Sequence, residues 1–198
     1  MIEDIKRDLL EIYKNKPHRM RHIEGVLQTA IEFGKKFKLD LHKLELAALL
    51  HDITKYYPLN EQKEIIKANY SNADYILNNY NDKILHSYSA AFVAKEKYGI
   101  TDNDVLGAIM HHTIGKANMN MYEKIIFLSD YIEPGRVYES CVKARELAKD
   151  NIDLAVYAAI DDSIIFYEKE KVNIPRESYQ ARAYYKKLLE ELIWLKYN

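Results

Sequence analysis

Apolar residues recur every three or four positions along most of the chain, and that spacing forms one face of an α-helix. Between Arg19 and Phe37, for example, Ile23, Val26 and Ala30 keep this spacing. No stretch alternates apolar and polar residues for long enough to predict a strand. The pattern predicts an all-α protein with helices over residues 2–15, 19–37, 41–55, 86–98, 102–112 and 120–132, two short helices within 60–81, and two or three more that end with 179–197.

Capping residues mark where several of these helices begin. Asp40, Thr101 and Asn120 are the predicted N-caps of the helices that follow them. The segment 41–55 is apolar almost all round in its middle, which favours a central position. Glycine and proline are scarce, at 6 and 4 residues, and no repeat, linker or low-complexity tract interrupts the chain. We therefore expect one compact helical bundle over residues 1–198.

Helical phase separates the seven histidines. The residues three, four and seven positions before His112 are all apolar, whereas those before His111 include Gly107 and Asp104. His112 is therefore predicted to face the core and His111 to face outward. His18, in a predicted loop beside proline, and His42, at a helix start, are expected to be exposed.

The same phase argument turns three more histidines and an aspartate inward, and a second aspartate follows one of these histidines directly. A lone inward histidine is more often a hydrogen-bonded core residue than a ligand. Two carboxylates buried among four imidazoles need a compensating positive charge, because an uncompensated buried carboxylate is costly. A divalent metal would keep the acids ionised and the imidazoles neutral. The predicted ligands are His22, His51, Asp52, His86, His112 and Asp130.

His51 and Asp52 are neighbours, and neighbours on a helix diverge by about 100°. Both can therefore reach one metal only if the metal lies near the end of their helix. The pair Tyr57-Pro58 predicts that this helix ends within a few residues.

The order of a lone His, then His-Asp, then further His and a final Asp resembles the signature of the HD superfamily. The stretches LLHDITK (49–55), AIMHHTIGKANMNMYEKIIFLSDYIEPGR (108–136), ARELA (144–148) and RMRHIEGV (19–26) are similar to its YqeK family of symmetrical bis(5′-nucleosyl)-tetraphosphatases. HD alone is a weak motif, whereas HHTIG followed by SDYIEPGR at this spacing is specific.

The resemblance implies an HD-domain hydrolase that splits diadenosine tetraphosphate into two ADP. It implies that His22, His51, Asp52 and Asp130 hold one metal, and that Asp52 bridges to a second metal completed by His86 and His112. The family's metal is iron, while imidazole and carboxylate ligands also permit manganese or zinc. Two such metals would turn a shared water into hydroxide near neutral pH.

Substrate contacts are expected close to these ligands. Lys55, one turn after His51, is the first candidate for a phosphate contact and for catalysis, and Arg136 is the second. Thr113 and Gly115 form a small-residue loop whose amides could approach a phosphate, although a plain helix-end turn explains them equally well.

Two positions depart from the family pattern. The segment HSYSAAF after His86 has Tyr88 and lacks a usual glycine, which we expect to narrow the pocket and alter substrate preference. Lys116 stands where an arginine is expected, and lysine keeps the charge but loses a two-pronged phosphate grip.

Composition fits a soluble globular protein, with 48% hydrophobic and 30% charged residues. The net charge of −1 gives no overall field for nucleic acid or an anionic membrane, and no apolar run is long enough to span a bilayer. The acidic amphipathic start is not a signal peptide, and the single cysteine, Cys141, excludes an internal disulfide. We expect a cytoplasmic protein, and its amphipathic C-terminal helix leaves a homodimer possible.

Two other functions stay open at the level of sequence. The same metals could serve a phosphohydrolase of mononucleotides, such as a nucleoside diphosphatase or nucleotidase. A metal-holding regulatory module without turnover is also possible, but its mark would be a damaged ligand set, and here the set is complete.

Overall fold

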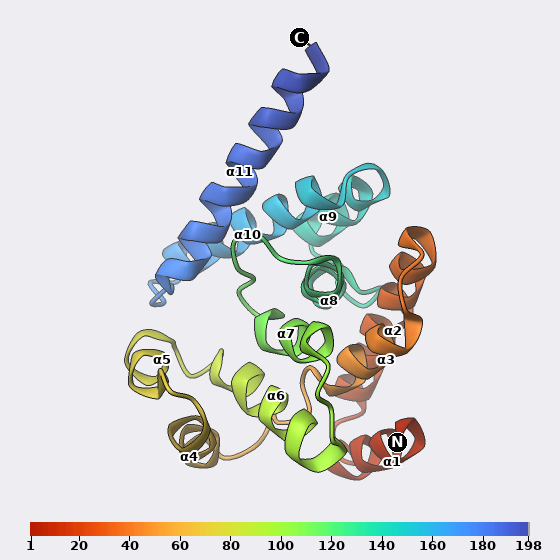
Figure 1. The fold of residues 1–198 in the computed structure, drawn as a ribbon, viewed down its shortest axis with the longest axis vertical. Helices are drawn as coiled ribbons and strands as arrows, with labels where there is room; N and C mark the ends of the chain where they lie inside the picture. The colour runs from red at the N-terminus through yellow and green to blue at the C-terminus, as the bar shows by residue number, and fades with distance from the viewer. Residues whose placement is uncertain (198) are drawn as a thin grey trace.

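The computed structural model describes residues 1–197, and no strand occurs among them, so the predicted all-α class is confirmed (Figure 1). Helices and short turns account for nearly all of the described chain. In order, the helices are α1 (Ile2–Ile12), α2 (Pro17–Phe37), α3 (Leu41–Leu50), α4 (Leu59–Asn69), α5 (Ala73–Asn79), α6 (Leu85–Tyr98), α7 (Asn103–His111), α8 (Met121–Ile132), α9 (Glu139–Asp150), α10 (Ile152–Lys169) and α11 (Arg176–Tyr197).

Helices α2, α3, α6, α7 and α8 form the centre of the molecule. Helix α8 packs against α2, α3, α7, α9 and α10, and α3 packs against α1, α2, α6, α7 and α8. The apolar middle of α3 explains its place, since every residue from Leu46 to Leu50 is buried. The predicted central position of this segment is therefore confirmed.

Helix α3 ends earlier than its sequence predicts. The helix expected over residues 41–55 ends at Leu50, and His51 is its C-cap residue. After it the chain makes successive tight turns, in which Ile53 N donates to Leu50 O and Lys55 N donates to Asp52 O. The hydroxyl of Thr54 donates to the backbone oxygen of His86, which ties these turns to α6. The tight turns therefore begin at the His51-Asp52 pair itself.

Other boundaries both correct and confirm the sequence predictions. Asp102, not Thr101, N-caps α7, since its side chain accepts hydrogen bonds from the amides of the first turn. Helix α2 begins at Pro17, so His18 is helical rather than in a loop, and proline fits there because a first-turn amide needs no partner. Asp40 caps α3, and Asn120 caps α8 in a reciprocal capping box, as predicted.

Two groups of helices flank the centre. Helices α4 and α5 pack on α6 around a second, smaller apolar cluster that includes Ile76 and Tyr88. Helices α9, α10 and α11 lie on the other side, and the second half of α11 extends away from the rest of the molecule (Figure 1). None of the described helices is long and apolar enough to cross a membrane.

A cavity of about 610 Å³ lies between these two flanking groups. Its rim is joined across the gap by two asparagines. Asn81 Nδ2 donates to the backbone oxygen of Asn173 (3.1 Å), and Asn173 Nδ2 donates to the backbone oxygen of Asn79 (3.2 Å). These bonds connect the α5–α6 loop to the α10–α11 loop beside the cavity.

Candidate metal centre

The six side chains that the sequence singles out lie close together in the structure. His22 Nε2 is 3.0 Å from Asp130 Oδ1, and His86 Nε2 is 3.0 Å from Asp52 Oδ1. His51 Nε2 is 3.5 Å from Asp52 Oδ2, and His112 Nε2 is 3.6 Å from Asp52 Oδ1. Asp52 therefore lies at the middle of the group, which we call the inner cluster: His22, His51, Asp52, His86, His112 and Asp130.

Donor atoms in the inner cluster are spaced closely enough to share an ion. One group joins His22, His51 and Asp130, and the other joins His51, Asp52 and His112, with all donor atoms of a group within 4.8 Å of one another. Imidazole nitrogen and carboxylate oxygen together suit divalent transition metals. The residues present therefore fit a divalent metal, and their binding of it stays a prediction.

Helix ends bring most of these side chains inward. His51 and His112 are the C-cap residues of α3 and α7, and His86 stands in the first turn of α6. Asp130 lies in the last turn of α8, and only His22 sits well inside a helix, α2. His111 lies outside the inner cluster and bonds to Glu123 instead, in line with the phase of its helix.

Hydrogen bonds at Nδ1 fix the rings so that Nε2 points at the centre. His51 Nδ1 donates to Ala48 O and His112 Nδ1 donates to Ile109 O, each at 2.7 Å. An Nδ1–H that donates leaves the lone pair on Nε2, which is the atom a metal takes. Within residues 1–197, Nε2 of His22 and Nε2 of His51 are buried without a hydrogen bond. Such unsatisfied buried atoms are costly unless a ligand engages them.

The protonation states also suit a cation. Burial lowers the pKa of His51 to about 3 and that of His86 to about 4, because a buried imidazolium loses its hydration. Burial would raise the pKa of Asp52, but the adjacent His51 and Lys55 and hydrogen bonds from His112 and His86 hold it well below its usual range. His51 and His86 are thus neutral and Asp52 is ionised, as metal ligands must be. The pKa of His22 is raised instead, because the effect of burial is outweighed by its contacts with Asp130, Asp52 and Glu133.

Two residues around Asp52 were not predicted. Arg19 Nη1 lies 2.7 Å from Asp52 Oδ2, and the Tyr13 hydroxyl donates to the backbone oxygen of Asp52 (2.6 Å). The sequence held one usable signal, since Arg19 precedes His22 by one helical turn and must share its face. Tyr13 is the C-cap residue of α1, and no local sequence pattern links it to the His51-Asp52 pair.

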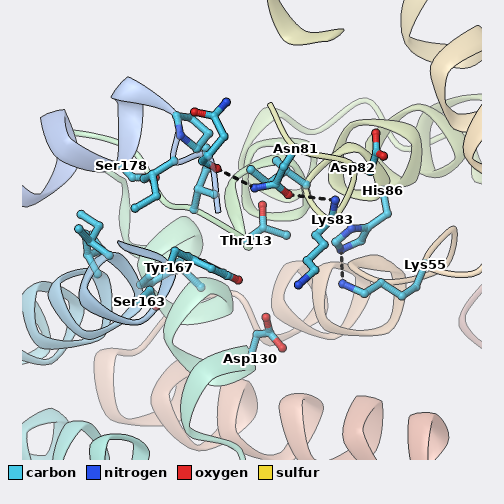
Figure 2. Close-up of a pocket in the computed structure, with 18 of the residues that line it drawn as sticks. Lys55, Asn81, Asp82, Lys83, His86, Thr113, Asp130, Ser163, Tyr167 and Ser178 are labelled. Carbon is cyan, nitrogen blue, oxygen red and sulfur yellow. Dashed lines mark hydrogen bonds between the residues drawn. The ribbon is translucent and has the colours of Figure 1, made fainter. Parts of the chain in front are cut away.

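The cavity opens directly onto the inner cluster, because His86 and Asp130 form part of its wall. Lys55 also lines it, with Nζ 3.1 Å from His86 Nε2 and 3.7 Å from Asp52 Oδ1 (Figure 2). Arg136 lines it as well, with Nη2 3.4 Å from Asp130 Oδ1. Both predicted phosphate contacts therefore lie beside the cluster.

Of the two predicted loop residues, one lines the cavity and the other does not. Thr113 is part of the wall, and its hydroxyl is buried without a partner in the described chain. Gly115 is absent from the wall, and its amide donates to His111 O (2.9 Å), which closes the end of α7. With φ of +63°, Gly115 serves the helix-end turn, so its predicted substrate contact has no support in the geometry.

The structure adds cavity residues that the sequence did not reveal. Lys83, from the α5–α6 loop, reaches into the middle of the cavity (Figure 2) and has no ion pair among the described residues. The opposite wall carries Ile164, Tyr167 and Ile174 from α10 and the loop after it. These segments lie far from the histidines along the chain, and no local pattern connects them.

The two departures from the family pattern do not act as expected. Tyr88 packs in the second apolar cluster against Tyr70 and Tyr80 and does not line the cavity. Lys116 does not line it either, and its Nζ lies 3.0 Å from Glu123 Oε1. Tyr88 therefore does not form part of the cavity wall.

Fold and cluster together define a class. An all-helical protein in which His-Asp at a helix end meets three more histidines and a second aspartate has the architecture of HD-domain hydrolases. The family described as HD domain matches residues 19–135, a stretch that contains all six side chains of the inner cluster.

Relatives place the chain more narrowly. It is 40% identical to a symmetrical bis(5′-nucleosyl)-tetraphosphatase of Halalkalibacterium halodurans over 77% of this chain and 81% of that protein. It is 32% identical to the enzyme of the same name from Staphylococcus aureus over 93% and 94%. The crystal structure of a predicted HD superfamily hydrolase involved in NAD metabolism from Clostridium acetobutylicum matches with a TM-score of 0.87 and 31% identity, over 94% of this chain and 97% of that one. The chain belongs to the HD-domain family, in the group of the symmetrical bis(5′-nucleosyl)-tetraphosphatases.

Proposed function

We propose that this protein hydrolyses diadenosine tetraphosphate symmetrically to two ADP. The observation that carries the proposal is the inner cluster opening onto a cavity lined by Lys55, Lys83 and Arg136. A metal-ligand cluster next to three cations suits a polyanionic substrate. The names of the Halalkalibacterium and Staphylococcus relatives support the same reaction.

The inner cluster is proposed to hold two divalent ions, iron first and manganese or zinc as alternatives. Asp52 is the proposed bridge between them, because its Oδ2 lies 3.5 Å from His51 Nε2 and its Oδ1 lies 3.0 Å from His86 Nε2. Bound there, the metals would supply the Lewis acidity that activates water and neutralises phosphate charge.

The protein's own residues bind and orient the polyphosphate. Lys55 and Arg136 flank the cluster on the cavity side, so they are proposed to hold the phosphate oxygens next to the reacting phosphorus. Lys83 lies farther along the cavity and is proposed to hold the phosphate nearer the nucleoside. The buried, unpartnered Thr113 hydroxyl is a proposed donor to the same chain.

The shape of the cavity supports symmetrical cleavage. Its volume of about 610 Å³ is in the range of sites for one small ligand, which suits one nucleoside diphosphate. The wall that carries Ile164, Tyr167 and Ile174 offers apolar side chains and is proposed to receive the nucleoside. If one ADP unit fills the cavity, the second phosphorus from that nucleoside is presented to the inner cluster. The other ADP then leaves without needing a second enclosed pocket.

Three wider features belong to the same proposal. Residues 1–198 are proposed to act as one HD-type domain, since helices from both ends of the chain line or support the site. A cytoplasmic location is proposed from the nucleotide substrate and the single cysteine, Cys141. A homodimer through the amphipathic helix α11 is part of the same proposal.

The test is an early product ratio. Purified protein loaded with iron or manganese is incubated with diadenosine tetraphosphate and the products are separated by HPLC. We expect two ADP per substrate, with no ATP or AMP before secondary hydrolysis. Equal ATP and AMP would overturn the assignment. Rapid turnover of ADP or GDP alone would favour the mononucleotide phosphohydrolase, and metal binding without any turnover would favour a regulatory module.

The bridging role has its own test. Asp52→Asn keeps the size of the side chain but removes its charge, so it is expected to lose both turnover and most of the bound metal. Metal content after purification, measured by atomic emission, would show this directly. An Asp52→Asn protein that retains two metals per chain would contradict the bridge.

A further inference from the structure

Glu133 is a buried carboxylate just beyond the inner cluster. It is 5% exposed and follows α8 as its C-cap residue. Its Oε1 lies 3.2 Å from His22 Nδ1, on the side of the ring opposite the nitrogen that faces the cluster. His22 therefore differs from His51 and His112, whose Nδ1 atoms donate to backbone carbonyls three residues earlier.

Two glycines make the room that this carboxylate occupies. Gly25 stands one turn after His22 on α2, and a Cβ there would lie 2.7 Å from Glu133 Oε2. Gly135 lies on the other side, where a Cβ would be 2.9 Å from the same oxygen, and its amide donates to that oxygen. A glycine inside a helix lowers its stability by roughly 0.5–1 kcal/mol relative to alanine. The space that the Glu133 carboxylate occupies explains why glycine stands at position 25 despite this cost.

Arg145 holds the backbone that carries Glu133. Its Nε donates to Ile132 O (2.9 Å), and its Nη2 donates to Glu133 O (3.0 Å) and to Arg136 O (2.9 Å). These three bonds join α9 to the turn after α8. They satisfy carbonyls left open where the helix ends, and they fix the turn from which Glu133 points at His22.

We propose that Glu133 is a positioning residue for the metal centre and acts through His22. Its carboxylate accepts the Nδ1–H of His22, which keeps the lone pair on Nε2 and aims it at Asp130 and Asp52. A carboxylate in this place also raises the basicity of the imidazole as a ligand. This inference rests on the proposed metal site, and it adds a residue that the ligand set does not contain.

The experiment measures metal affinity rather than activity. Metal-free parent, Glu133→Gln and Glu133→Ala are titrated with Mn²⁺ alone, and the dissociation constants are read by calorimetry or electron paramagnetic resonance. Loss of such an outer partner typically costs 10–100-fold in affinity. We expect roughly that loss for Glu133→Ala and a smaller one for Glu133→Gln, whose amide oxygen still accepts the Nδ1–H.

Glu123→Gln is the matched control. Glu123 is equally buried and also bonds a histidine Nδ1, but that histidine, His111, lies outside the inner cluster. The Glu123→Gln substitution should change the Mn²⁺ affinity by less than about 3-fold, which corresponds to about 0.6 kcal/mol. Parent-like affinity in a folded Glu133→Ala protein would overturn the positioning role. A parent that binds no Mn²⁺ would overturn the metal site itself, and the positioning role with it.

A second pair of variants keeps both carboxylates in place. Gly25→Ala pushes a Cβ against Glu133, while Gly107→Ala puts one 3.0 Å from Glu123 Oε1. We expect weaker Mn²⁺ binding only for Gly25→Ala, together with a shift of the ¹⁵N resonance of His22 Nδ1 in the metal-free protein. An unshifted resonance with unchanged affinity would show that the contact does not orient the ring.

Discussion

Two histidine–glutamate pairs in this protein look alike at first sight. His22 bonds Glu133 and His111 bonds Glu123, each through Nδ1, at 3.2 and 2.9 Å. Both glutamates are almost fully buried, and each rests against a glycine of the histidine's own helix. Yet one pair borders the inner cluster and the other does not.

The difference lies at the far nitrogen of each histidine and not at the carboxylates. Glu123 Oε1 also meets Lys116 Nζ (3.0 Å), and its Oε2 accepts the amide of Asn120 (2.8 Å) in the capping box of α8. Glu133 has comparable partners, since its Oε1 lies 3.8 Å from Arg136 Nε and its Oε2 accepts the amide of Gly135. His22, by contrast, turns a buried Nε2 without a hydrogen bond toward Asp130. A histidine–glutamate pair marks a metal site only when the far nitrogen is left unsatisfied among other donors.

Removing each histidine is the strongest way to break this comparison. His22→Ala deletes a predicted ligand, so it should weaken Mn²⁺ binding by more than the roughly 100-fold upper end for an outer partner and abolish turnover. His111→Ala should leave Mn²⁺ affinity within a few-fold of the parent and lower stability by about 1–3 kcal/mol, since it leaves Glu123 short of a partner. Titration and urea unfolding of both variants measure these effects.

The opposite ranking would refute the phase argument as well as the comparison. If His111→Ala lost the metal and His22→Ala kept it, the adjacent histidines of α7 would have been assigned the wrong way round. Circular dichroism of each variant confirms that the helices remain.

A second comparison concerns two lysines, Lys55 beside the inner cluster and Lys116 beside the His111–Glu123 pair. Lys55→Ala removes a cation that lines the cavity, and we expect kcat to fall about 10–100-fold while the metal content stays unchanged. This loss is smaller than the roughly 10²–10³-fold loss of kcat on removing a fully enclosed hydrogen-bond donor. Lys116→Ala removes a cation that only balances Glu123, so kcat and KM for diadenosine tetraphosphate should stay within about 2-fold. Steady-state kinetics at saturating substrate decide it, and parent-like kcat for Lys55→Ala would exclude its catalytic role.

Much of the fold follows from local sequence, because helical phase and capping act over a few residues. Phase turned His112 inward and His111 outward, and Asp40 and Asn120 cap the helices predicted for them. Helix ends were harder. Thr101 and Asp102 both suit an N-cap, and only the backbone geometry chose Asp102. The apolar run after residue 41 hid the end of α3 at Leu50, because the turns that follow are tied to α6 by the Thr54 hydroxyl, a contact distant in sequence.

The site divides in the same way. Helical phase indicated that its histidines and Asp130 face inward, although His51 and His112 are C-cap residues and Asp52 lies in the turns after α3. Lys83, Tyr167 and Arg145 reach the site from loops and helices whose positions depend on tertiary packing, and no local pattern predicts that. Gly115 shows the converse ambiguity, since a glycine that ends a helix looks the same in sequence as one that approaches a phosphate.

The smallest expected effect concerns pH, and it tests whether Glu123 is purely structural. Burial would raise the pKa of Glu123, but hydrogen bonds from His111, the Asn120 amide and Lys116 outweigh it and lower the pKa from 4.5 to about 2. A carboxyl with a lowered pKa contributes stability that is fully present above pH 4.5 and is lost as pH falls toward 2.

Glu123→Gln cannot titrate, so it should cost about 2 kcal/mol of unfolding free energy at pH 6, and the difference from the parent should shrink below pH 4.5. Urea unfolding of metal-free parent and variant at pH 6, 5, 4 and 3 measures it. A difference that stayed constant across that range would mean that the charge of Glu123 does not stabilise the fold. The two pairs would then differ only in position, and not in what their carboxylates do.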